Sequence, residues 1–181
     1  MNRRHFVGTV AAISAAFNFA RPSRAATHSA EARLRELGIV LPEAPGPAAV
    51  YVPFRRTGQL VFIAGQIPPA DAGIPTVGKV GAELTVEQGY AAARLVGLRI
   101  LAQLRNACDG DLDRVVQALQ IRGFVNCSAD FTAQPAVING VSELLREVFG
   151  DSGLAARAAL GTNSLPLNAA VEVESIFEIR H

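Results

Sequence analysis

The chain has 181 residues and a net charge of +1, and half of its residues are hydrophobic. This length and composition predict one globular domain with a sizeable core. A near-neutral chain lacks the basic surface that attracts nucleic acids and anionic membranes, so no nucleic-acid partner is expected.

Residues 1–25 have the pattern of an export signal. Arg3 and Arg4 come before a short apolar run at residues 6–20, and the small residues at positions 23 and 25 suit a signal peptidase. The paired arginines and the following His-Phe-Val resemble the twin-arginine export motif. We therefore predict a twin-arginine signal peptide, a periplasmic mature protein and no stable membrane association after cleavage. An uncleaved anchor is the alternative, although a membrane span needs about 20 apolar residues.

The cysteines and histidines do not form a pattern for metal binding or nucleophilic catalysis. Cys108 and Cys127 are too few for a disulfide framework, so buried free thiols are expected. His5, His28 and His181 lie in the signal or at the termini, which leaves no metal-ligand cluster and no Ser-His-Asp arrangement. We expect neither a metal nor a cofactor.

Residues 26–47 predict a helix followed by an extended lead-in. Residues 29–37 have a helical pattern, with Ser29 as the N-cap and Gly38 after the last turn. The prolines at residues 42–47 then favour an extended chain.

Residues 48–181 predict the main domain. Its first two strands are expected at residues 49–52 and 60–64, with the tip of their hairpin at residues 55–58. A loop rich in Gly, Pro and Ala follows, with a short strand around Lys79.

Two amphipathic helices complete the predicted architecture. Thr85 and Gln88 form the pattern of a capping box, which begins a helix that ends near Ala107. Residues 119–125 predict a strand, and residues 135–150 predict the second helix, which starts at a proline and ends at a glycine. Both helices repeat apolar residues at a spacing of three and four. The order predicts an α+β fold, a mixed β-sheet backed on one face by two helices.

The last 27 residues combine a patterned strand with a nearby arginine. Residues 171–179 alternate apolar side chains with glutamates, which is typical of a strand with one buried face. Arg157 lies in the small apolar run at residues 155–160, which predicts the preceding strand. If the two strands form a hairpin centred at residues 164–165, Arg157 lies opposite Glu172. Such a pair is either a structural ion pair worth about 0.2–1 kcal/mol or a site for a small acid.

Three stretches of the sequence match one family in order. They are Tyr51 with the Gly-Gln-Ile-Pro at residues 65–68, Asp130 and Phe131 with Asn139, and Arg157 with the Leu-Pro at 165–166 and the Val-Glu-Val-Glu-Ser-Ile at 171–176. In these stretches the chain resembles the RidA/YjgF family of reactive-intermediate deaminases, also called L-PSP endoribonucleases. Residues 78–81, 110–115 and 137–140 resemble its chorismate-mutase-like subgroup most closely. The resemblance implies a chorismate mutase-like fold and a homotrimer with clefts between subunits.

The resemblance also implies a site for a small-molecule carboxylate. Arg157 would hold the carboxylate of a 2-imino or enamine acid, because a guanidinium presents two donors that match a carboxylate. Glu172 would position or deprotonate the water that attacks the imine carbon. The backbone around Ala159 would help to hold this water, and Tyr51 and Asn139 would line the cleft, across a subunit boundary.

Three positions depart from the family pattern. Ala64 stands where the family has serine before Gly65, which removes a hydroxyl from the substrate-binding wall formed by these two residues. Ala155 replaces the proline of the Pro-Ala-Arg motif, and Ala159 replaces a Cys- or Thr-like residue. A pocket with fewer hydrogen-bond donors suggests an altered choice of substrate.

Two functions are therefore weighed. One is cofactor-free hydrolysis of imino or enamine acids, favoured because both Arg157 and Glu172 are present. The alternative is a non-catalytic periplasmic protein that binds a small carboxylate in the same cleft, favoured by Ala64 and by the export signal. A ribonuclease is disfavoured because no basic surface and no catalytic histidine are visible. A chorismate mutase would need several converging cations, and only Arg157 is placed by the match, since Arg55 and Arg56 fall at the predicted hairpin tip.

Overall fold

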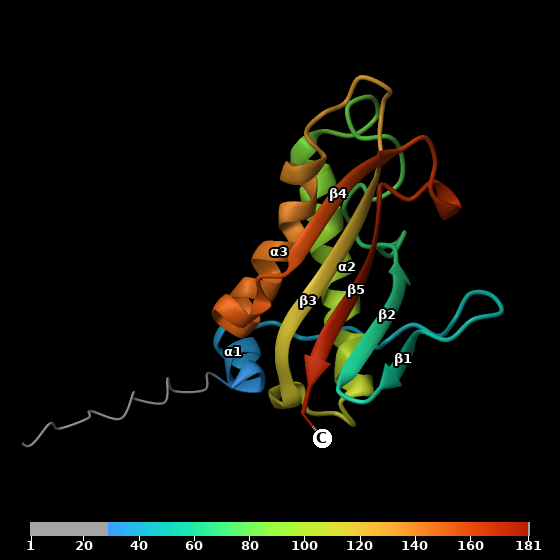
Figure 1. Cartoon of the computed structure of the whole chain (residues 1–181). Coiled ribbons are helices and arrows are strands. Elements are labelled where there is room, and N and C mark those ends of the chain that lie inside the picture. The colour runs from blue at the N-terminus through green and yellow to red at the C-terminus, as the bar shows by residue number, and fades with distance from the viewer. Residues whose placement is uncertain (1–28, 181) are drawn as a thin grey trace, which may run out of the picture.

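A computed structural model describes residues 29–180, which build one mixed sheet with helices on one face (Figure 1). The predicted signal peptide lies outside the described residues. The strands are β1 (Phe54–Thr57), β2 (Leu60–Gln66), β3 (Val115–Asn126), β4 (Ala156–Thr162) and β5 (Val171–Ile179), in the spatial order β1-β2-β5-β3-β4. β3 and β4 are parallel, and the other pairs are antiparallel. The predicted α+β fold with a mixed sheet is confirmed.

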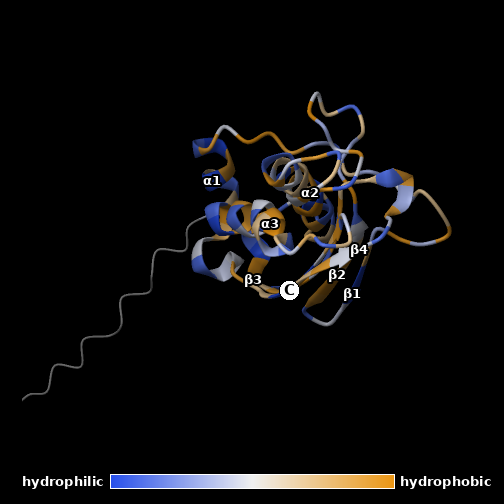
Figure 2. Ribbon diagram, turned by 90° about the horizontal axis from the view of Figure 1, so that it is seen from above, coloured by the Kyte–Doolittle hydropathy of each residue, from blue (hydrophilic) through white to orange (hydrophobic). Residues whose placement is uncertain are grey.

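Helices α2 (Val86–Ala107) and α3 (Gln134–Phe149) cover one face of this sheet, as predicted (Figure 2). Thr85 caps α2 in a capping box in which the Thr85 hydroxyl accepts from the Gln88 backbone N–H and the Gln88 side chain accepts from the Thr85 backbone N–H. The short helix α1 (Ala30–Glu36) begins at the predicted N-cap Ser29 and packs against α3.

The core lies between the sheet and the two long helices. Along β5 burial alternates strictly, with Val171, Val173, Phe177 and Ile179 buried against the helices and the glutamates on the other face. This confirms the period-two pattern of the last strand. Cys108 and Cys127 are both buried and unpaired, as expected. Among the described residues, no helix is long and apolar enough to cross a membrane.

The hairpin predicted between β4 and β5 is wrong. β4 pairs only with β3, residue for residue from Gln120 beside Ala156 to Asn126 beside Thr162, and β5 pairs with the other edge of β3. α3 is the crossover that joins the parallel strands β3 and β4, as a helix does in a βαβ unit. β4 and β5 therefore lie on opposite sides of β3, and the chain must cross β3 between them. The connector at residues 163–170 makes this crossing, so it is not a hairpin turn.

The first strand also differs from the prediction. Residues 49–51 form bends, residue 52 has no regular structure, and β1 begins at Phe54. The hairpin tip lies at Gly58 and Gln59 instead of residues 55–58, and Gly58 has a φ of 54°, which favours glycine. Around Lys79, only isolated bridges of Val77 and Val80 replace the expected short strand.

Candidate active site

Arg157 and Asn139 form the first half of the candidate site. Arg157 lies on the edge strand β4, and its Nη1 donates to Asn139 Oδ1 at 2.8 Å and to Ser142 Oγ at 3.0 Å. Asn139 and Ser142 are three residues apart on α3, so they lie on one face of the helix, toward β4. These contacts hold an exposed guanidinium at a defined place. Sequence reasoning placed Arg157 and Asn139 in one cleft but missed Ser142, whose i+3 spacing from Asn139 was the available signal.

The surroundings of Arg157 are polar. A shallow hollow of about 260 Å³ is lined by Arg157, Asn139, Ser142, Glu143, Arg146 and Leu154. Glu143 accepts a hydrogen bond from the Tyr90 hydroxyl at 2.6 Å, which directs its carboxylate toward α2. Ala159, two residues along β4 from Arg157, is partly buried and packs against the core. This half therefore offers a fixed cation that suits a carboxylate.

Glu172 lies in a second and larger cavity. This cavity of about 630 Å³ brings Glu172 together with three other predicted residues, Tyr51, Ala64 and Gly65. Burial, and then the nearby Glu174 carboxylate, raise the pKa of Glu172 above its ordinary value. A carboxyl with a raised pKa suits the exchange of a proton with a bound water molecule.

Gly65 allows the close approach between β2 and β5 at this cavity. A Cβ atom at position 65 would overlap Glu172 Oε1, so a side chain there would displace the carboxylate. The pairing of the two strands also shifts register between Ile63 and Gln66, which re-aims the backbone at this point. The absence of a side chain at Gly65 therefore leaves room for the Glu172 carboxylate; Gly65 is not needed here to form a turn.

The two halves lie on opposite faces of the sheet within one protomer. Arg157 is in register with the buried Ile121 of β3, so it faces the helix layer. Glu172 is in register with Phe124, so it faces away from that layer. The predicted cross-strand pair of Arg157 and Glu172 is therefore wrong, because β3 lies between them and their side chains leave the sheet in opposite directions.

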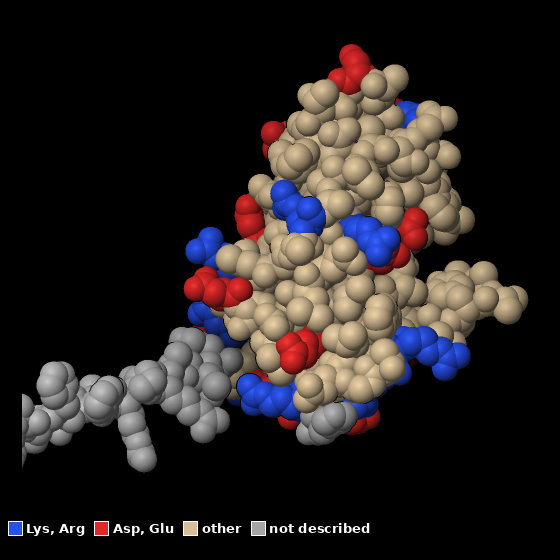
Figure 3. Space-filling view, in the orientation of Figure 1, with Lys and Arg blue, Asp and Glu red and all other residues tan. Residues whose placement is uncertain are grey.

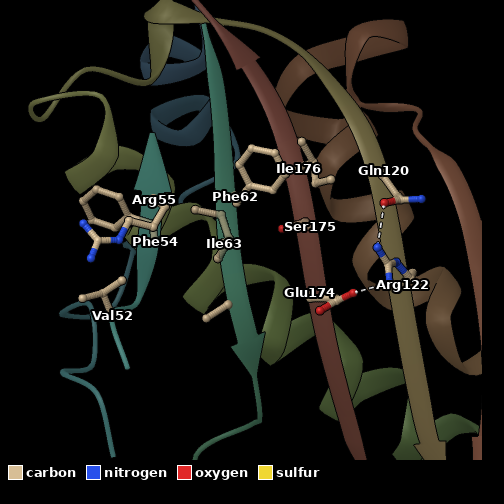
Figure 4. A pocket seen from close by; sticks show the side chains of 11 residues that line it. Val52, Phe54, Arg55, Phe62, Ile63, Gln120, Arg122, Glu174, Ser175 and Ile176 are labelled. Atoms are coloured by element: carbon tan, nitrogen blue, oxygen red, sulfur yellow. Dashed lines mark hydrogen bonds and ion pairs between the residues drawn. The ribbon is translucent and has the colours of Figure 1, made fainter. Parts of the chain in front are cut away.

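On the open face of the sheet most of the surface belongs to residues other than Lys, Arg, Asp and Glu (Figure 3). The three glutamates of β5 and Arg122 of β3 also lie on this face. Phe62 and Leu160 project there and are 40% and 49% exposed. A hollow of about 300 Å³ on this face contains Arg122, which bonds to Gln120 at 3.2 Å and to Glu174 at 3.0 Å (Figure 4). Of the predicted site residues only Ala64 lines this hollow.

Arg99 was missed by the sequence reasoning. It lies on α2 and lines the cavity of Glu172, where its Nη1 donates to the carbonyl oxygen of Ile67 at 2.9 Å. An arginine on the polar side of an amphipathic helix ordinarily meets solvent. Only the packing of α2 against the end of β2 shows that Arg99 reaches this cavity, so the sequence held no signal for it.

Comparisons with known proteins agree on one relationship. The family described as "YjgF/chorismate_mutase-like, putative endoribonuclease" matches residues 31–179. Protein TCP17 of Trypanosoma cruzi is 44% identical over 151 residues, which cover 83% of this chain and 94% of that protein.

Two solved structures are similar in both sequence and shape. Atu1372 of Agrobacterium tumefaciens is 42% identical, with a TM-score of 0.76 over 83% of this chain and 92% of that chain. A protein of Shewanella oneidensis MR-1 described as a "putative endoribonuclease" is 34% identical, with a TM-score of 0.78 over 83% and 99% of the two chains.

Proposed function

The chain belongs to the YjgF/RidA family, and from this premise we propose that it hydrolyses reactive 2-imino or enamine acids to 2-keto acids and ammonia without a cofactor. The observation that carries this proposal is the pair of complementary half-sites. One presents a fixed guanidinium at Arg157, and the other presents the partly buried carboxyl of Glu172 with a raised pKa. Together they supply a carboxylate anchor and a proton acceptor.

The proposed reaction uses each half once. The Arg157 guanidinium binds the substrate carboxylate through two N–H donors. Glu172 accepts a proton from a water molecule as the water oxygen forms a bond to the imine carbon, and the electrons of the C=N bond move to nitrogen. Glu172 then returns the proton to nitrogen. Glu172 next takes the hydroxyl proton of the resulting carbinolamine and passes it to the nitrogen. As the C=O bond forms, the C–N bond breaks and releases ammonia and the 2-keto acid.

We propose that the two halves meet across subunit boundaries in a homotrimer. Arg157 and Glu172 face opposite sides of the sheet within one chain, so a site that uses both needs a second copy. The exposed side chains of Phe62 and Leu160 on the open face support association, because aromatic and apolar side chains are typical of the buried centre of an interface. The arginine half of one subunit would then complete the glutamate half of its neighbour.

The decisive experiment is release of 2-keto acid from an imine freshly generated by an amino-acid oxidase. We expect the protein to accelerate release above the spontaneous rate. Arg157→Ala and Glu172→Gln should each remove about 10²-fold or more of this acceleration, the range typical of lost general-base or charge-assisted contacts. Arg35→Ala, at an exposed position on α1, is the matched control and should retain it. Equal rates with and without the wild-type protein would refute deamination.

A second function is supported by one observation. Positions 64 and 159 are both alanine, so neither side chain offers the proposed site a hydroxyl or a thiol for hydrogen bonding. A small-carboxylate-binding protein without turnover needs only the Arg157 anchor and the cavity. If carboxylates bind to a trimer that releases no keto acid, binding is the function. The export-signal pattern of residues 1–25 supports a periplasmic location for either activity, and this location is part of the proposal.

A further inference from the structure

Arg99 is a cation with uncommitted donors in the cavity of Glu172. Its Nη1 donates to the carbonyl oxygen of Ile67, whereas its Nε and Nη2 meet no hydrogen-bond acceptor among residues 29–180. No carboxylate of the described chain lies within 4.0 Å of its guanidinium, although Arg94 and Arg105 on the same helix both form ion pairs. Arginine has five N–H donors in a planar fork, so most of this fork is available to a ligand.

Glu172 does not neutralise Arg99. The two residues line one cavity, yet they form no ion pair. Glu172 also keeps a raised pKa, caused by burial and by Glu174, which an adjacent guanidinium would oppose. The cavity therefore holds a carboxyl and a cation at separate places.

The cavity is built for a ligand longer than the smallest imino acids. Its volume of about 630 Å³ falls in the range of about 300–1,000 Å³ typical of sites that enclose drug-sized ligands. Residues 45–53 form one wall, and the buried Gln103 of α2 fixes this wall by donating to the carbonyl oxygen of Pro45 at 2.6 Å. Apart from Glu172 and Arg99, the lining is mainly apolar and includes Pro53, Ile67 and Pro166.

We propose that Arg99 binds a second anionic group at the far end of the substrate, so that the preferred substrate is a 2-imino acid whose side chain ends in a carboxylate. This inference rests on the proposed function, in which Arg157 of a neighbouring subunit holds the first carboxylate and Glu172 serves the imine carbon. The apolar lining contacts the methylene groups between these two ends. A carboxylate is the smallest planar partner that accepts two hydrogen bonds from one guanidinium.

The test compares two imines that differ at the far end of the side chain. Oxidases generate the imine of glutamate, which ends in a carboxylate, and the imine of leucine, which is apolar. We expect kcat/KM to favour the glutamate imine. Arg99→Leu should reduce kcat/KM for the glutamate imine by about 10–100-fold, the usual value of a hydrogen bond to a charged group. The leucine imine should change by no more than about twofold.

Matched variants separate ligand binding from a structural role. Arg99→Lys keeps the charge and should retain part of the preference for the glutamate imine, whereas Arg35→Leu on α1 should leave both rates unchanged. Equal losses on the two imines in Arg99→Leu would overturn the proposal, because removal of the Ile67 contact alone would act on both.

A measurement on the wild-type protein covers the case in which Arg99→Leu does not fold. Glutarate should compete for the site at least about 10-fold more tightly than pentanoate, since only glutarate carries the second carboxylate. Equal affinities would overturn the role of Arg99. Turnover of the leucine imine without a preference for the glutamate imine would refute this inference alone, whereas no turnover of either imine would refute the proposed deamination.

Discussion

At the scale of single residues, Glu172 differs from the two other glutamates of β5 in its surroundings. Glu174 pairs with Arg122 at 3.0 Å, and Glu178 accepts a hydrogen bond from Gln117 at 2.7 Å. Among the described residues Glu172 has no such partner, and it lies in the cavity beside Gly65. The alternating pattern places all three glutamates on one face of β5, so it cannot show which of them belongs to a site. The family resemblance selected Glu172, and the packing around it gives the physical reason.

The raised pKa of Glu172 predicts a pH dependence. A general base must be ionised, so activity should rise with pH through the pKa of Glu172, which lies above the ordinary value of a glutamate. Burial is the larger cause, and the negative charge of Glu174 is the second. Glu174→Gln should therefore lower the pKa of Glu172 and move the acid limb of the kcat/KM profile to lower pH.

The control for this profile is Glu178→Gln, on the same face of β5 but outside the cavity. It should leave the acid limb unchanged, because Glu178 does not contribute to the pKa of Glu172. An unchanged profile in Glu174→Gln would show that Glu172 does not set the acid limb.

At the scale of elements, the β3-α3-β4 unit decides where Arg157 lies. The crossover helix packs beside the edge strand that follows it, so Asn139 and Ser142 reach the guanidinium. Both long helices were predicted because capping and apolar spacing are local signals. The pairing partner of β4 was predicted wrongly, because adjacency in sequence favours a hairpin whereas the sheet is completed by a parallel pair.

Close packing of α2 against α3 depends on Gly140. A Cβ atom at this position would overlap the carbonyl oxygen of Tyr90 and crowd the Arg94 backbone nitrogen. Alanine raises helix propensity by about 1 kcal/mol over glycine, but this backbone overlap forces the helices apart. We expect Gly140→Ala to lower the free energy of unfolding by about 1–3 kcal/mol.

Chemical denaturation measures this change, with Gly46→Ala as the matched control. A Cβ atom at Gly46 has no neighbour within 4 Å, so its substitution should alter stability by no more than about 0.5 kcal/mol. A Gly140→Ala protein more stable than the wild type would contradict the close packing.

At the scale of the whole molecule, the proposed trimer explains why one chain separates Arg157 from Glu172. A glutamate in place of Phe62 should prevent association, because it removes an exposed aromatic side chain and adds a charge that the interface would have to desolvate. We expect Phe62→Glu to yield a monomer in light scattering and to lose deaminase activity, while the wild type is a trimer. Val40 is 88% exposed on the segment after α1, so Val40→Glu should remain trimeric and active. A wild-type monomer with full activity would refute the shared site.

The sequence by itself determined the fold class, both long helices and the buried face of the last strand, and its family resemblance nominated Arg157, Glu172, Tyr51 and Asn139 for the candidate site. Each of these depends on local periodicity, on capping residues or on motifs within one family. Only the tertiary structure decided that β3 separates Arg157 from Glu172, that Gly65 makes room for the Glu172 carboxylate and that Arg99 enters the same cavity. These relations join residues far apart in the chain, and they are set by how the helices and strands pack together, which no local pattern records.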